Sequence, residues 1–134
     1  MADLIYIQDN GKLAFGDFTL AAKAKADGFE FGGDLYKVKT FQEITKLERN
    51  GMFAYESVPG TDVREFSAND KELSFAVEGT TDTQVALGLE AEKEYKLYID
   101  GTNIGKMKTN LGGKLVFSLQ LAAGRSSEVR VVKQ

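Results

Sequence analysis

The stretch DGTNIGKMKT, residues 100–109, is the part of the sequence that comes closest to a chemical motif. Its glycines and lysine are similar to a loop that holds nucleotide phosphates. Such a loop needs four residues between its glycines, and a Ser or Thr after its lysine to hold magnesium. Here three residues separate Gly101 from Gly105, and Met107 takes the place of the hydroxyl. We therefore predict a hairpin that turns at residues 102–103, with a second turn at 110–113.

The residue inventory excludes most other catalytic chemistry. The sequence has no Cys, no His and no Trp. Ser-His-Asp triads and Cys-His pairs therefore have no base, and zinc, copper, haem and iron–sulfur centres lack their usual ligands. No segment has the ligand spacing of an EF-hand, and Asp9 is better explained as a turn residue. We predict no metal site and no cofactor.

Paired carboxylates remain a route to catalysis, because a glycosidase needs only two carboxyl groups that lie close in space. The least regular part of the chain holds four candidates: Glu43, Glu56, Asp62 and Glu65. Side chains of this kind are mostly solvated surface charges. The prediction is therefore that no residue is catalytic, and the sequence does not rank the four.

Aromatic side chains are the other candidates for function, because exposed rings stack on sugars. Phenylalanines at alternating positions are typical of a core. The better candidates for ligand contacts are three tyrosines, Tyr36, Tyr55 and Tyr98. Tyr98 alternates with apolar residues at 95, 97 and 99, so its side of that segment is expected to be covered or to form an interface.

Alternating apolar and polar residues indicate the elements that carry these candidates. The pattern is clear in KELSFAVEG (71–79), TQVALGLE (83–90), EYKLYID (94–100), KLVFSLQL (114–121) and SEVRVVKQ (127–134). Such alternation is typical of strands with one face on a core and one in water. Turn signals rich in Gly separate the segments, about every ten residues, which favours an antiparallel arrangement.

The predicted fold is all-β: an antiparallel β-sandwich, Ig-like or jelly-roll-like, of eight to ten strands in one domain over residues 1–134. A hairpin is expected at Asn10-Gly11. Residues 42–49 are ambiguous, since they fit a short helix and also the first strand of a hairpin turning at Asn50-Gly51. We favour the hairpin.

Charge and hydropathy limit the partners. The net charge is −3, and acidic and basic residues are interspersed. KAKAD (23–27) and KMKT (106–109) are too small to form a basic stripe, so we expect no nucleic-acid partner. No segment has the length of a membrane span or the pattern of a signal peptide, so we expect no membrane partner and a cytoplasmic location.

Two portions of the chain resemble known proteins. The segments GDLYKVKTFQEITKLERNGMFAYESVPGT (33–61) and GKMKTNLGGKLVFSL (105–119) resemble small bacterial proteins labelled "endosialidase" or "endosialidase chaperone". YKLYIDGTNIGKMKTNLGGKLVFSL (95–119) is similar to the closing strands of β-sandwich domains appended to polysaccharide-degrading enzymes. The label implies hydrolysis of sialic-acid polymers. The four arginines are spread along the chain, however, and no sialidase motif maps onto it, so no catalytic residue is carried over.

The expected function is a non-enzymatic binding or assembly module that acts through sheet edges and exposed tyrosines, with self-association into a homo-oligomer as one form of assembly. One alternative is a glycan-binding protein or a sialic-acid-polymer hydrolase, as the resemblance implies. A second alternative is a phage-derived structural or chaperone domain.

Overall fold

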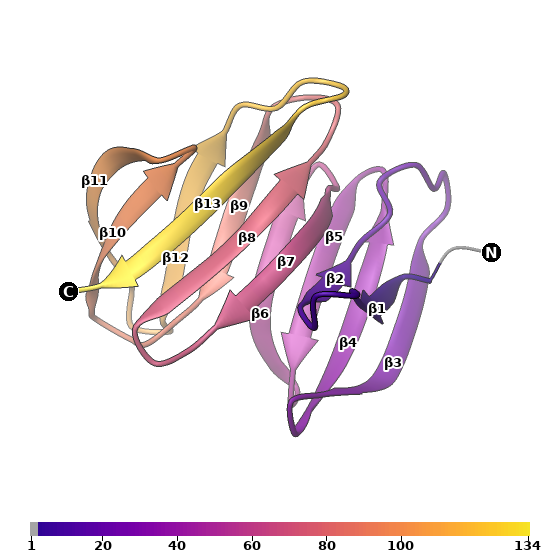
Figure 1. The fold of residues 1–134 in the computed structure, drawn as a ribbon, viewed down its shortest axis with the longest axis horizontal. Coiled ribbons are helices and arrows are strands. Elements are labelled where there is room, and N and C mark those ends of the chain that lie inside the picture. Colours follow the sequence, from indigo (N-terminus) through magenta and orange to yellow (C-terminus); the bar gives the residue numbers. More distant parts are fainter. Residues whose placement is uncertain (1–2) are drawn as a thin grey trace.

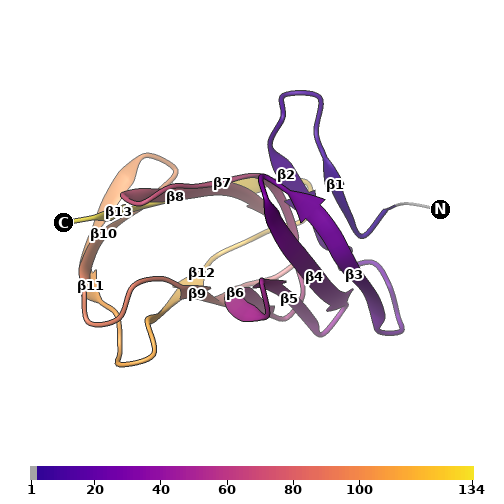
Figure 2. The same ribbon diagram turned by 90° about the horizontal axis from the view of Figure 1, so that it is seen from below.

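The computed structural model describes residues 3–134, and this part of the chain forms thirteen β-strands and no helix. The strands make two antiparallel sheets that face each other as the layers of a sandwich (Figures 1 and 2). The predicted all-β sandwich is confirmed. The hairpin expected at Asn10-Gly11 is confirmed, because Ile5–Ile7 pairs with Leu13–Phe15. There are more strands than the eight to ten expected, and Ala24–Phe31 is a strand that the weak alternation of its segment did not define.

The larger sheet has seven strands in the order β1-β2-β7-β8-β13-β10-β11. In that order the strands are Ile5–Ile7 (β1), Leu13–Phe15 (β2), Asp62–Ala68 (β7), Glu72–Glu78 (β8), Ser126–Lys133 (β13), Glu94–Ile99 (β10) and Thr102–Lys108 (β11). The β10–β11 hairpin contains the motif of residues 100–109. The hairpin turns at Asp100-Gly101, where both φ angles are positive, whereas Thr102 and Asn103 already belong to β11, so the predicted turn at residues 102–103 is corrected. The return strand leads to another strand and not to a helix, so the phosphate-loop interpretation is excluded.

The smaller sheet has six strands in the order β12-β9-β6-β5-β4-β3. In that order the strands are Lys114–Leu119 (β12), Thr83–Gly88 (β9), Met52–Val58 (β6), Ile44–Arg49 (β5), Asp34–Phe41 (β4) and Ala24–Phe31 (β3). Strands β3 to β6 form a continuous meander of hairpins, since each pairs with the next.

The helix considered for residues 42–49 does not form, because this segment contains β5. Thr45 and Leu47 are fully buried, whereas Lys46 and Glu48, which follow them in the sequence, are half-buried. Burial therefore repeats every two residues, which a strand permits and a helix does not. The favoured hairpin is confirmed, and Asn50-Gly51 turns it with positive φ angles of 53° and 77°.

Aromatic rings from both sheets meet in the core. Tyr55 of β6 makes edge-to-face contacts with Phe15 of β2 and Phe75 of β8, with ring centroids 5.4 and 5.5 Å apart. Aromatic pairs prefer such geometry over face-to-face stacking. These ring contacts therefore join the two sheets in the core.

The C-terminus lies at one end of the long axis, and strands β1, β3 and β4 lie toward the other end (Figure 1). Between residues 3 and 134 there is no helix that is long and apolar enough to cross a membrane.

Candidate functional site

Two of the three candidate tyrosines lie in the core. The side chains of Tyr36 and Tyr55 are 5% and 0% exposed. Tyr36 shares the inner face of β4 with Val38, which is fully buried, and burial raises its pKa. Neither ring can stack on a sugar in this structure, so the prediction of ligand contacts is corrected for both.

The Tyr55 hydroxyl belongs to a buried network of hydroxyl groups. It hydrogen bonds to Thr61 Oγ1 at 2.8 Å, and Ser57 Oγ bonds to the same atom at 2.7 Å. Thr45 Oγ1 donates to the Thr61 carbonyl and accepts from its N–H. Burial raises the pKa of Tyr55 to about 12. These hydroxyls hold the segment after β6 in place and are not free for chemistry.

Tyr98, in contrast, lies on the outer face of the seven-stranded sheet and is half-buried. It lines a depression of about 320 Å³. The Arg130 guanidinium lies 4.5 Å from the centre of its ring, because Tyr98 and Arg130 are direct partners across β10 and β13. Arg130 in turn pairs with Ser74 of β8, which also lines the depression.

Two turns border this Tyr98 depression. Lys12 and Glu65 contribute from the side of the β1–β2 hairpin, and Figure 2 shows that hairpin standing out beyond the outer face of the sheet. The Glu65 N–H donates to Gln8 Oε1 at 2.7 Å, which ties the hairpin to β7. On the other side, Asp100 Oδ1 accepts the Glu128 N–H at 2.9 Å beside the turn at Gly101. Both borders are therefore held by hydrogen bonds.

Charges of both signs meet around the Tyr98 ring. Lys12 and Arg130 are cationic, and Glu65 and Glu128 are anionic. Arg130 also forms an ion pair of 3.3 Å with Glu72. A pocket with an aromatic ring, a hydroxyl and paired charges suits a ligand rich in hydroxyl groups, because carboxylates accept and cations donate hydrogen bonds.

The four candidate carboxylates are not gathered in one place. Glu56 is on β6 of the smaller sheet and Glu43 is exposed in the β4–β5 turn, whereas Asp62 and Glu65 are on β7 of the larger sheet. Only Glu65 lines the depression, where Glu128 is the second carboxylate. The sequence did not single out Glu128, because its alternation in β13 is that of any solvated strand residue.

Asp62 has a structural contact that accounts for its partial burial. Its Oδ1 accepts the Phe18 N–H at 3.0 Å, which ties the segment after β2 to β7. Burial is the main cause that raises its pKa to about 6; Asp17 and Glu78 add to the rise, while the Phe18 N–H and Arg64 oppose it. Asp62 therefore holds a loop and lies outside the depression.

The outer face of the smaller sheet carries four lysines, Lys25, Lys37, Lys39 and Lys46, which together we call the lysine cluster. They surround a hollow of about 80 Å³ that Glu48 also lines. In the sequence these lysines are separate, interspersed charges. They come together only because β3, β4 and β5 pair in the observed register.

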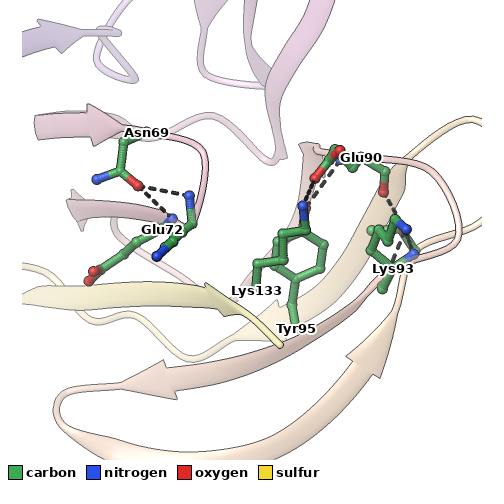
Figure 3. Close-up of polar contacts among 8 residues, drawn as sticks. Asn69, Glu72, Glu90, Lys93, Tyr95 and Lys133 are labelled. Carbon is green, nitrogen blue, oxygen red and sulfur yellow. Dashed lines mark hydrogen bonds and ion pairs between the residues drawn. The ribbon is translucent and has the colours of Figure 1, made fainter.

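A third polar group closes one end of the sandwich (Figure 3). Glu90 forms an ion pair with Lys133, which lowers the pKa of Glu90 and raises that of Lys133. The Tyr95 hydroxyl accepts the Glu90 N–H at 3.2 Å, and Thr109 Oγ1 accepts the Lys93 N–H at 2.9 Å. These contacts join the β9–β10 connection to the end of β11 and to β13, so their role is structural.

Comparison with protein families, with curated proteins and with solved structures gives no match for this chain. The resemblance to endosialidase-labelled proteins therefore stays a prediction.

Proposed function

We propose that this protein is a non-enzymatic binding module and that its ligand is a glycan held in the Tyr98 depression. The observation that carries the proposal is the Tyr98–Arg130 pair, which lines a depression bordered by two hydrogen-bonded turns. A binding site that exists before the ligand arrives costs less conformational entropy on binding.

The use of the other polar groups supports binding over catalysis. The Tyr55 hydroxyl and its neighbours satisfy one another, Asp62 holds a backbone N–H, and Glu78 forms an ion pair of 3.1 Å with Arg64. Among the described residues, no buried side-chain nitrogen or oxygen lacks a hydrogen-bond partner. These groups therefore have structural partners, whereas Lys12 and Glu128 of the depression form no ion pair with another described residue.

A glycan-array screen of the wild-type chain and of Tyr98→Ala tests the proposal. The wild type is expected to bind, and the variant to lose about 1–3 kcal/mol of stacking and hydrogen-bond energy, which corresponds to a loss of affinity of roughly 5- to 150-fold. Tyr6→Ala is the matched control, because Tyr6 is an exposed tyrosine on β1 that does not line the depression. A wild type that binds no glycan, or two variants that lose binding equally, contradicts the proposal.

A second candidate is a glycoside hydrolase, since Glu65 and Glu128 line the same depression. Catalysis would require one carboxyl as acid and the other as base or nucleophile. Incubation of the wild type with the glycans that it binds, followed by detection of new reducing ends, separates the two functions. If the wild type produces new reducing ends and the Glu65→Gln and Glu128→Gln variants do not, the protein is a hydrolase. If the glycans stay intact with the wild type, the protein is a binding module.

A further inference from the structure

We propose that the lysine cluster is a binding site for the terminal phosphate of a small phosphorylated ligand. The cluster lies on the outer face of the smaller sheet, and the Tyr98 depression lies on the outer face of the larger one. The inference goes beyond glycan binding and does not depend on it.

The arrangement of the lysines does not stabilise the folded sheet, because lysines lie opposite lysines on neighbouring strands. Lys25 is the direct cross-strand partner of Lys39, and Lys39 is the direct partner of Lys46. Like charges that lie directly opposite each other destabilise a sheet. The neighbouring pair of Lys37 and Glu48 shows the favourable alternative, in which opposite charges face each other. Strand pairing therefore does not explain three lysines in a row.

The positive charge in this region is largely uncompensated. Lys46 has two carboxylates beside it, since Glu48 pairs with it at 3.9 Å and Glu56 of β6 is its direct cross-strand partner. For the other three lysines, no carboxylate of residues 3–134 lies within ion-pair distance. The hollow has four lysines and one glutamate, so four positive charges and one negative charge leave a net charge of +3. This local excess occurs in a chain whose overall net charge is −3.

The size of the hollow favours a compact anion. Side chains from three strands converge on about 80 Å³, rather than lining a long groove. A phosphate monoester concentrates roughly −1.5 to −2 charges and three acceptor oxygens on one group. A carboxylated polymer carries a single charge on each unit and would need a longer row of cations. Lysine binds phosphate as a point charge, which this cluster provides.

Nucleic acid fits the hollow less well than a small phosphorylated ligand. Single strands are held by bases that stack on aromatic rings, and no aromatic residue lines the hollow. The cluster also contains no arginine to bind successive phosphates in bidentate fashion. The expected ligand is therefore a small molecule with a terminal phosphate.

Calorimetric titration of the full chain with inorganic pyrophosphate, at low ionic strength and pH 7.5, tests the site. We expect measurable binding by the wild type and a loss of affinity of about tenfold in Lys39→Gln, because one charge-assisted contact is removed. Glu48→Gln is expected to bind more tightly, since it removes the carboxylate that lines the hollow. Lys106→Gln, on β11 of the other sheet, is the matched control and should bind as the wild type does.

A second measurement separates a binding role from a structural one. Lys39→Gln relieves the repulsion on both of its neighbours, so its thermal midpoint should rise while its affinity for pyrophosphate falls. The proposal is overturned if the wild type does not bind pyrophosphate, if Lys39→Gln binds it as Lys106→Gln does, or if citrate binds as tightly. A fall in the thermal midpoint of Lys39→Gln would equally contradict it, because the lysine would then be structural.

Discussion

At the scale of single residues, Asp62 shows how burial changes a titration. Its pKa in the folded protein is about 6, whereas the ordinary value is 3.8. Between these two values the folded protein binds more protons than the unfolded chain. The contribution of Asp62 to stability therefore grows as the pH falls from about 6 to 4, and it is lost as the pH rises through 6.

The substitution Asp62→Asn tests this linkage. Asparagine keeps the oxygen that accepts the Phe18 N–H and removes the buried charge. We expect a thermal midpoint a few degrees higher at pH 7 and a smaller gain in stability on acidification from pH 6 to 4. Thermal unfolding of the wild type and the variant at several pH values from 4 to 7 measures both quantities. Asp100→Asn is the control, because Asp100 also accepts a backbone N–H but is exposed; the same pH profile in both variants would contradict the role of burial.

The hydroxyl network allows a second test at this scale. Thr61→Val keeps the shape of the side chain but removes the oxygen shared by Tyr55 and Ser57. Each buried hydroxyl left without a partner costs roughly 1–3 kcal/mol. Tyr55→Phe should cost only about 1 kcal/mol, since Thr61 keeps Ser57 as its partner. Urea unfolding measures the free energy of unfolding of both variants, and Thr61→Val is expected to be the less stable one. If the two are equally stable, the shared Thr61 oxygen does not stabilise the hydroxyl network.

At the scale of elements, a glycine in β9 permits a close approach to the neighbouring strand β6. A Cβ atom at Gly88 would lie 2.1 Å from the Phe53 carbonyl oxygen. Because Gly88 has no side chain, its cross-strand partner Lys114 can place its ammonium group 5.1 Å from the centre of the Phe53 ring. The pairing of β5 and β6 is irregular directly after Phe53, where Ala54 has no partner in the register.

Gly88→Ala should therefore destabilise the protein by about 3 kcal/mol or more, because the clash involves backbone that cannot move without disturbing β6. Chemical unfolding measures the loss. Gly112→Ala is a suitable control, since its φ is not positive and its added Cβ would meet only a side-chain atom at 3.5 Å. Equal stability of the two variants would mean that β6 moves aside easily.

Elements were predictable from the sequence where burial alternates strictly. The inner faces of β8, β9, β12 and β13 are those that the apolar residues of each segment indicated. Alternation also placed Tyr98 on the outer face. The same alternation in YKVKT (36–40) puts Tyr36 on the side of Val38, in the core, where the structure has both residues.

What the sequence could not provide is any feature that depends on register between distant segments. The Tyr55 ring is buried against Phe15 of β2 and Phe75 of β8, which belong to the other sheet and are far from it in the sequence. Lys25 and Lys39 are fourteen residues apart and become neighbours only through one register of β3 and β4. Glu128 likewise joins Tyr98 only because β13 pairs with β10.

At the scale of the whole molecule, the two sheets use their inner and outer faces differently. Their inner faces bury aromatic rings and hydroxyls that satisfy one another. Their outer faces carry two distinct sets of charges, one around Tyr98 and one in the lysine cluster. The molecule therefore offers a mixed-charge surface on one side and a cationic surface on the other. Our central claim is that the mixed-charge surface binds the glycan.

The most direct test of this claim is a nuclear magnetic resonance titration of the ¹⁵N-labelled chain with the best-binding glycan of the array. Amide shifts are expected to cluster at Ser74, Tyr98 and Arg130, while the amides of Lys25 and Lys39 stay unchanged. Shifts confined to the lysine cluster, or spread evenly over both sheets, would contradict a glycan site at Tyr98.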